Sequence, residues 1–302
     1  MSGDAAEDEA VELVSRLRSR FQGALVGLAV GEALAAPAVY GRPGSFAPVR
    51  DLLGGGPHDL PRGAWGDDTA MALCVARSLV ETGGCDPDDQ LDRYRRWQRD
   101  GEGSATGECV GIGAGTARAL VDGRPDGAVP DGAESLARIV PLALRYWADA
   151  EALQNAVRAA TAVTCHEPAT FDAAARCGAA LLAALRGAPP EDVVDALADA
   201  GADAPARPPT VPTAAAAVPP AVVLHAAAGA FADAAGWKDA VLRAVNLGGP
   251  ADALGALSGA LAGAHFGVEA IPAAWRGALA RREEIEDLAD RLLADALVGL
   301  VA

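Results

Sequence analysis

The fold is decided by one stretch, Phe21-Gln22-Gly23-Ala24-Leu25-Val26-Gly27-Leu28-Ala29-Val30-Gly31-Glu32-Ala33-Leu34, in which small and apolar residues surround a single charge. This composition predicts a buried helix built from small side chains. Glu32 is the exception, because a buried carboxylate must be paired, protonated or functional. The stretch therefore predicts a helical core with a candidate functional group inside it.

The rest of the chain shares this character. Hydrophobic residues make up 51% of the 302 residues and aromatic residues only 4%, while Ala and Gly abound. A core of small side chains requires elements that approach one another closely, and helices packed on helices meet that requirement best. The length is sufficient to bury a substantial core without disulfides or metal ions.

Nearly every segment with a readable period has the helical one. Apolar residues between Ile285 and Leu293 recur on one face of an amphipathic helix. Asp86 and Pro87 are typical of an N-cap and a first helical position. Further helices are predicted over residues 67–82, 135–146, 150–163, 170–185, 191–199, 222–234, 238–245 and 250–266, and no strand of useful length is expected.

These patterns predict an all-α protein with a single compact multi-helix domain over residues 21–302. An acidic lead and helix precede it over residues 1–20. The Pro/Ala-rich segment 201–220 is interpreted as an internal loop, because the helical pattern is similar on both sides of it.

Charge and cysteine usage exclude several classes of partner. The net charge of −16 repels phosphate backbones and anionic lipid, so neither nucleic acid nor a membrane is expected as a partner. The five cysteines are odd in number and lack CxxC spacing, which favours reduced thiols. The beginning of the chain lacks a signal-peptide pattern, and charges, Gly or Pro interrupt the apolar runs. We therefore expect a cytoplasmic protein, and the oligomeric state stays open.

Three aspartates are candidates for chemistry. Asp67 and Asp68 in Trp65-Gly66-Asp67-Asp68-Thr69 offer the hard oxygens that Mg²⁺ or Mn²⁺ prefers. The alternative is that both aspartates cap a helix and complement its dipole. Asp252 follows the Gly248-Gly249 pair and Pro250, where an acid is also favoured for structural reasons.

The histidines and the remaining glycines carry weaker signals. His166 precedes Pro168, where a helix should stop, so its interaction with the helix dipole is an alternative to binding. His58, His225 and His265 have no neighbouring motif and are interpreted as structural. Gly111, Gly113 and Gly115 suggest a phosphate cradle only weakly, because no βαβ pattern follows them.

Taken together, five blocks in order resemble the ADP-ribosylglycohydrolase family, all-helical proteins whose members remove ADP-ribose from modified side chains with two Mg²⁺ ions. The matching blocks are residues 21–34, 65–69, 138–142, 164–168 and 244–275. The resemblance implies a substrate-binding set made of Gly111, Gly113, Gly115, Ser135, Arg138, His166, Gly248 and Gly249.

The resemblance is weakest at the metal motifs. Where the family has ligands, this chain has Gly66, Pro250 and Ala253, so that Asp67, Asp68 and Asp252 remain. Mg²⁺ depends on carboxylate charge, so a two-metal centre is not expected, and at most one Mg²⁺ or Mn²⁺ would be held by these three aspartates. Without an ion, converging acids would raise one another's pKa values.

The expected function is that of a divergent ADP-ribosylglycohydrolase-like hydrolase. It would cleave or transform an N-glycosidic bond in a small ribosyl, nucleotide or NAD-like compound. Asp67, Asp68 and Asp252 are the first candidates for catalysis. Glu32 and Glu134 come second, and for Glu134 a solvated loop acid is the alternative. Two further hypotheses stay open, an inactive member that binds a ligand or partner, and a scaffold for an unrelated reaction.

Overall fold

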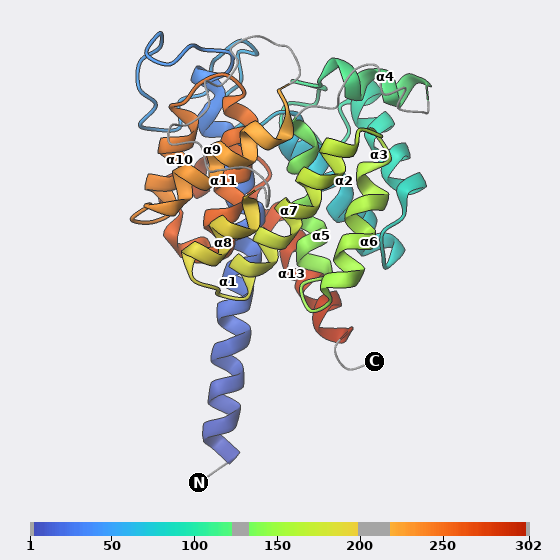
Figure 1. Ribbon diagram of the computed structural model, residues 1–302, viewed down its shortest axis with the longest axis vertical. Helices are drawn as coiled ribbons and strands as arrows, with labels where there is room; N and C mark the ends of the chain where they lie inside the picture. Colours follow the sequence, from blue (N-terminus) through green and yellow to red (C-terminus); the bar gives the residue numbers. More distant parts are fainter. Residues whose placement is uncertain (1–2, 123–132, 199–217, 300–302) are drawn as a thin grey trace.

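The core is built on two buried helices, α1 (Gly3–Ala35) and α11 (Ala251–Phe266), in a computed structural model that describes residues 3–122, 133–198 and 218–299 (Figure 1). Three glycines of each helix face one another, in the pairs Gly23 with Gly263, Gly27 with Gly259, and Gly31 with Gly255. A Cβ atom added at any of the six would lie between 1.8 and 2.2 Å from a carbonyl oxygen of the opposite helix. The two backbones are therefore in direct contact.

This contact confirms the expectation of closely approaching helices. Residue numbers rise along α1 as they fall along α11, so the two helices are antiparallel. The indole of Trp237 adds a hydrogen bond from its Nε1 atom to the carbonyl oxygen of Gly259, at 2.9 Å. The arrangement fixes the register of α1 against α11, because a shift by one residue would drive a side chain into the facing backbone.

Most of the other helices contact this pair, and the rest pack against those outer helices (Figure 1). They are α2 (Asp67–Thr82), α3 (Pro87–Asp100), α4 (Ala114–Asp122), α5 (Ile139–Arg145), α6 (Ala150–Thr161), α7 (Pro168–Leu185), α8 (Pro190–Leu197), α9 (Pro220–Ala232), α10 (Trp237–Val245), α12 (Ala273–Ala278) and α13 (Arg282–Val298), with short 3₁₀ turns η1 (Ala36–Ala38), η2 (Ala133–Leu136) and η3 (Val268–Ala270).

The described residues form no strand, as expected, and one isolated bridge pairs Gly55 with Leu60. The amphipathic C-terminal helix is confirmed as α13, whose apolar face is buried. The prediction of one helix over 135–146 is wrong, because η2 and α5 divide that segment. Pro141 lies in the first turn of α5, where its missing N–H costs no helical hydrogen bond. Helices α4 and α12 were not predicted.

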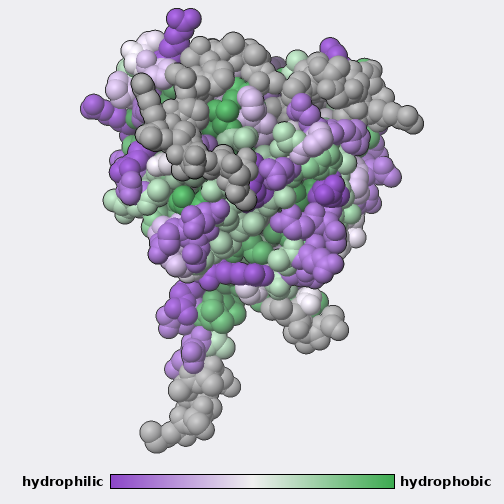
Figure 2. Space-filling view, viewed as in Figure 1, coloured by the Kyte–Doolittle hydropathy of each residue, from purple (hydrophilic) through white to green (hydrophobic). Residues whose placement is uncertain are grey.

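The first helix crosses the expected boundary at residue 20 without a break. Its beginning projects from the body of the protein (Figure 1), and Val11, Leu13 and Val14 are exposed there. Hydrophobic side chains gather where the helix leaves the body (Figure 2). One helix of the described residues, Asp8–Ala38, is long and apolar enough to cross a membrane, and 89% of its apolar window is buried inside the protein.

The predicted internal loop lies largely outside the described residues, which resume at residue 218. Its last residue, Pro220, is the first residue of α9.

Candidate active site

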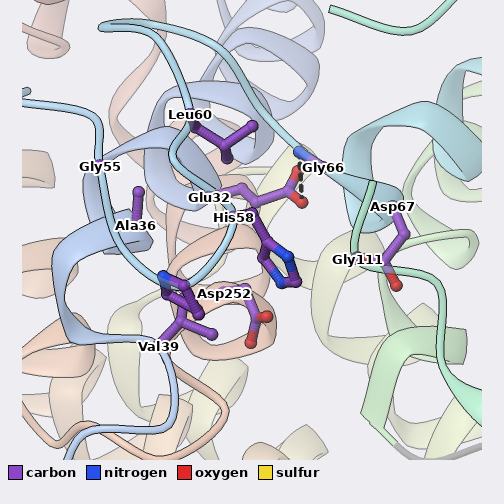
Figure 3. Close-up of a pocket in the computed structure, with 11 residues that line it drawn as sticks. Glu32, Ala36, Val39, Gly55, His58, Leu60, Gly66, Asp67, Gly111 and Asp252 are labelled. Carbon is purple, nitrogen blue, oxygen red and sulfur yellow. Dashed lines mark hydrogen bonds between the residues drawn. The ribbon is translucent and has the colours of Figure 1, made fainter. Parts of the chain in front are cut away.

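A small pocket lies where the end of α1 meets the beginnings of α2 and α11 (Figure 3). Its volume of about 20 Å³ is room for about one water molecule. Three carboxylates, Glu32, Asp67 and Asp252, belong to its lining. The other lining residues are Ala36, Val39, Gly55, Pro57, His58, Leu60, Gly66 and Gly111. The fold thus brings together three acids that the sequence singled out in separate segments.

Glu32 caps a helix to which it does not belong. Its Oε1 atom accepts from the amide of Gly66 and its Oε2 atom from the amide of Thr69, both at 2.9 Å. These amides stand at the N-terminus of α2, where the N-cap residue Gly66 has no side chain of its own. Burial raises the pKa of Glu32 to about 7, and the charge of Asp252 adds to the shift, while the two amides oppose it.

The hypothesis that Asp67 and Asp68 cap α2 is wrong, because Glu32 supplies the acceptors. Both aspartates do lie in the first turn of α2, where an acid complements the helix dipole. Both aspartates are buried, with 4% and 2% exposure, and the Oδ1 atom of Asp68 has no hydrogen-bond partner among the described residues. Burial raises the pKa of both carboxyls well above the usual range. The neighbouring charges, led by Glu134 for Asp67 and by Asp67 for Asp68, act in the same direction.

Asp252 enters the pocket from the beginning of α11 (Figure 3). The helix begins at Ala251, one residue later than predicted, and Pro250 is its N-cap. Asp252 is therefore the second helical residue. Burial raises the pKa of Asp252, and the shift is opposed first by the amide of Ala253, which donates to Oδ1 of Asp252 at 2.9 Å, and less by His58.

Two of the predicted binding glycines lie directly against acids. A Cβ atom at Gly111, whose φ is +89°, would lie 2.3 Å from Oδ1 of Asp67. A Cβ atom at Gly113 would lie 2.2 Å from the carboxylate oxygens of Glu134. The absence of side chains here lets the segment before α4 close over both carboxylates. Gly115 lies in the first turn of α4.

Glu134 belongs to a polar network beside these acids. It is half-buried in η2, so the alternative of a solvated loop acid is wrong, and it accepts from Oγ1 of Thr116 at 3.4 Å. Arg138 is 2% exposed and donates to Oγ1 of Thr164 at 2.5 Å and to Oγ1 of Thr116 at 3.1 Å. Ser135 is equally buried. These two hydrogen bonds of Arg138 tie α4 to the connection between α6 and α7.

The remaining predicted binding residues lie at the edge of this region. The amide of Gly249 donates to the carbonyl of Gly41, and its carbonyl accepts from the amide of Tyr40. Gly248 packs against the same Gly41 carbonyl. His166 is exposed between α6 and α7, beyond the end of α6, and is not among the residues that line the pocket.

Sequence reasoning missed two residues of the site. His58 was interpreted as structural, yet it lines the pocket, and its imidazole lies near Glu32 and Asp252 (Figure 3). Tyr40 contacts His58 edge to face, and burial together with four carboxylate charges raises the pKa of its hydroxyl to about 12. The stretch Gly54-Gly55-Gly56-Pro57-His58-Asp59 carries a turn signal, but nothing local indicates what that turn faces.

The donor set does not fit a two-ion centre. Gly66, Pro250 and Ala253 offer no side-chain oxygen at three of the positions where the family has ligands. Within residues 3–122, 133–198 and 218–299, no group of three His, Cys, Asp or Glu side chains could hold an ion. Among the described residues of this site, two buried oxygens without a partner suit a cation, Oδ1 of Asp68 and Oγ1 of Thr69.

Comparisons with known proteins agree with this architecture. A family model described as ADP-ribosylglycohydrolase matches residues 13–299. A solved structure titled "ADP-ribosylglycohydrolase-related protein complex" superposes with a TM-score of 0.81 and 39% identity, over 93% of this chain and 99% of that one.

Curated relatives match over shorter segments. The ADP-ribosylarginine hydrolase Tri1 of Serratia proteamaculans is 43% identical over 99 residues, which are 33% of this chain and 27% of that protein. The ADP-ribosyl-[dinitrogen reductase] glycohydrolase of Rhodospirillum rubrum is 36% identical over 85 residues, 27% of this chain and 29% of that protein. The match thus spans less than a third of either relative. From the family match over nearly its whole length, the chain belongs to the ADP-ribosylglycohydrolase family.

Proposed function

We propose that this protein hydrolyses the N-glycosidic bond of a small ADP-ribosyl compound by means of its buried carboxylates. The single observation that carries the proposal is the burial of Asp67 and Asp68 at a helix start that Glu32 already caps. Burying acids is costly, and groups with strongly shifted pKa values concentrate at functional sites. The relatives named for the removal of ADP-ribose support the choice of substrate class.

The raised pKa values suit the two proton transfers of this reaction. The C–N bond breaks with its electron pair moving to the leaving nitrogen, and positive charge develops on the ribose carbon. An ionised carboxylate stabilises that charge and takes a proton from the attacking water. A protonated neighbour supplies a proton to the leaving nitrogen. Asp67, Asp68 and Asp252 are assigned these roles.

Glu32 takes a positioning role in this proposal. Both of its oxygens already accept backbone amides of α2. It therefore holds the helix start that carries Asp67 and Asp68. Glu134 remains a second-rank candidate beside Asp67.

The proposal includes at most one Mg²⁺ or Mn²⁺. Asp67, Asp68 and Asp252 would be its carboxylate donors, and a bound cation would neutralise part of their charge. Because no three such side chains of the described residues are arranged to hold an ion, binding would require these aspartates to draw closer together. Calorimetric titration of metal-free protein with Mn²⁺ tests this part. We expect no more than one ion per chain, and loss of binding in Asp252→Asn. Two ions per chain would contradict the proposal.

The decisive experiment measures release of ADP-ribose from ADP-ribosylarginine and from NAD⁺. Turnover that Asp67→Asn abolishes, while a thermal melt shows intact folding, would establish a carboxylate-dependent glycohydrolase. Binding of ADP-ribose without any turnover would instead favour the alternative of an inactive, ligand-binding member. The observation that favours this alternative is the absence of side-chain oxygens at three positions where the family has metal ligands.

A further inference from the structure

A tight hairpin carries His58 to the mouth of the pocket. Gly55 and Leu60 exchange two backbone hydrogen bonds, from the amide of Gly55 at 2.7 Å and from the amide of Leu60 at 3.0 Å. Within this pair, the amide of Asp59 donates to the carbonyl of Gly56 at 3.2 Å, which closes a β-turn with Pro57 and His58 at its centre.

The hairpin is held firmly against the end of α1. A Cβ atom at Gly56, whose φ is +72°, would lie 1.9 Å from the carbonyl oxygen of Ala36. A Cβ atom at Gly54 would lie 2.4 Å from the carbonyl oxygen of Leu60. The approach of Gly56 to Ala36 fixes the turn on η1, and the approach of Gly54 to Leu60 tightens the hairpin itself, so the backbone sets where His58 lies.

Tyr40 holds the imidazole from the other side. Its ring meets that of His58 edge to face, with centroids 6.3 Å apart and planes at 75°. Tyr40 has a φ of 60°, which is rare for a bulky residue and persists only where the surroundings require it. The amide of Tyr40 donates to the carbonyl of Gly249 at 2.7 Å, next to the start of α11. Backbone strain is thus held at the mouth of the acid pocket.

The size of the pocket determines where a substrate must lie. About 20 Å³ accommodates roughly one water molecule and cannot enclose a sugar ring. A ribose whose reacting carbon faces the acids therefore has to lie across the mouth, where His58 is exposed. The two ring nitrogens of an imidazole can form hydrogen bonds with adjacent ribose hydroxyls.

We propose that His58 contacts the ribose of the substrate at the pocket mouth, and that Tyr40 is the positioning residue that holds the imidazole there. This inference rests on the proposed function for its substrate class. It assigns two residues outside the carboxylate set to substrate recognition, and it predicts that their loss weakens binding more than it slows chemistry.

The test measures the Kd of ADP-ribose by calorimetry, and kcat and KM for ADP-ribosylarginine. We expect His58→Ala to weaken ADP-ribose binding and to raise KM by about tenfold, the loss of one hydrogen bond at full strength, with kcat nearly unchanged. His58→Gln, which keeps a donor and an acceptor, should recover part of the affinity. His225→Ala on α9 is the matched control, because His225 is not among the residues that line the pocket.

The positioning role of Tyr40 is tested with variants that keep or remove its aromatic ring. Tyr40→Phe keeps the ring and should bind ADP-ribose as the unaltered protein does, whereas Tyr40→Leu should resemble His58→Ala. The double variant Tyr40→Leu/His58→Ala should be no weaker than His58→Ala, because Tyr40 acts through His58. Multiplied effects in the double variant would overturn the positioning role.

The outcomes separate this inference from the proposed function. Unchanged Kd and KM in His58→Ala would overturn the inference even if the enzyme is active. A shifted Kd in a protein without turnover would support it while the proposed function fails. Failure of the unaltered protein to bind ADP-ribose would count against both.

Discussion

Two helices of this protein begin with the same kind of sequence and use it differently. At the start of α3, Asp86 caps its own helix by accepting from the amides of Asp88 and Asp89 at 3.0 and 3.1 Å. At the start of α2, the cap is Glu32, which lies 34 residues before Gly66 in the chain. The aspartates of α2 are buried instead of solvated.

The difference shows that acids at the start of a helix can take two separate roles. Around α3 the acids satisfy free amides and remain in water. Around α2 an acid from another helix does that work, and Asp67 and Asp68 are buried at a cost that capping does not require. Burial and the source of the cap, and not the local sequence, distinguish the acid pair of α2, to which we assign a function, from the capping acid of α3.

The largest expected effect is a difference in turnover between a variant at the start of α2 and a variant at the start of α3. Asp67→Asn should lower turnover of ADP-ribosylarginine on the order of 100- to 10,000-fold, the range for loss of an acid or base. Its unfolding free energy should stay within about 1 kcal/mol of the unaltered value. Asp86→Asn is the matched control, because Asn caps as well as Asp. Equal turnover in the two variants would contradict the contrast.

Removing the cap that comes from α1 should cost stability. Glu32→Ala leaves the amides of Gly66 and Thr69 without their acceptor inside the protein, and we expect a loss of about 3 kcal/mol. Urea unfolding monitored by circular dichroism measures it. A loss no greater than that of an ordinary helix cap would show that water replaces Glu32.

The pH dependence that Glu32 gives to stability should be opposite in sign to that of an acid whose pKa is lowered on folding. Glu32 has a pKa of about 7 in the folded protein against an ordinary value of 4.5, so the unfolded chain releases its proton first as the pH rises. Stability from this group is therefore lost between pH 4.5 and 7, on the order of 3 kcal/mol. Unfolding in chelator-treated buffer across this range should show the fall, and Glu32→Gln should reduce it. A flat profile would contradict the burial of an acid here.

The smallest effect belongs to α3. Asp86→Ala should lower the unfolding free energy by about 1 kcal/mol, the usual value of an N-cap, and should leave turnover unchanged. Denaturant midpoints and initial rates measure both. A drop in turnover would mean that the two helix starts are coupled.

Features that depend on neighbouring residues were predictable from the sequence. The N-cap role of Asp86 and the amphipathic face of α13 follow from spacing alone, and both are confirmed. Helices that begin in glycine-rich segments were harder to predict, because Gly111, Gly113 and Gly115 give no helical pattern at the start of α4. The spacing of glycines along residues 23–31 and 255–263 was a usable signal for the contact of α1 with α11.

The candidate site was predictable only in part. Asp67, Asp68, Asp252 and Glu32 carry charge in apolar surroundings, which the sequence displays. The cap that Glu32 supplies to α2 joins residues far apart in the chain, and no local pattern encodes it. The same holds for His58, whose surroundings are set by the hairpin and by the distant acids.

The glycine contact of α1 with α11 has a mechanical consequence. Glu32 directly follows Gly31, and Asp252 lies three residues before Gly255, so two acids from opposite ends of the chain are mounted on one rigid joint. Because the two backbones are in direct contact, a displacement of one helix moves the acid on it relative to the acid on the other. A slight loosening between the two helices would therefore misalign the carboxylates while the fold persists, so the proposed activity would be lost before the fold is.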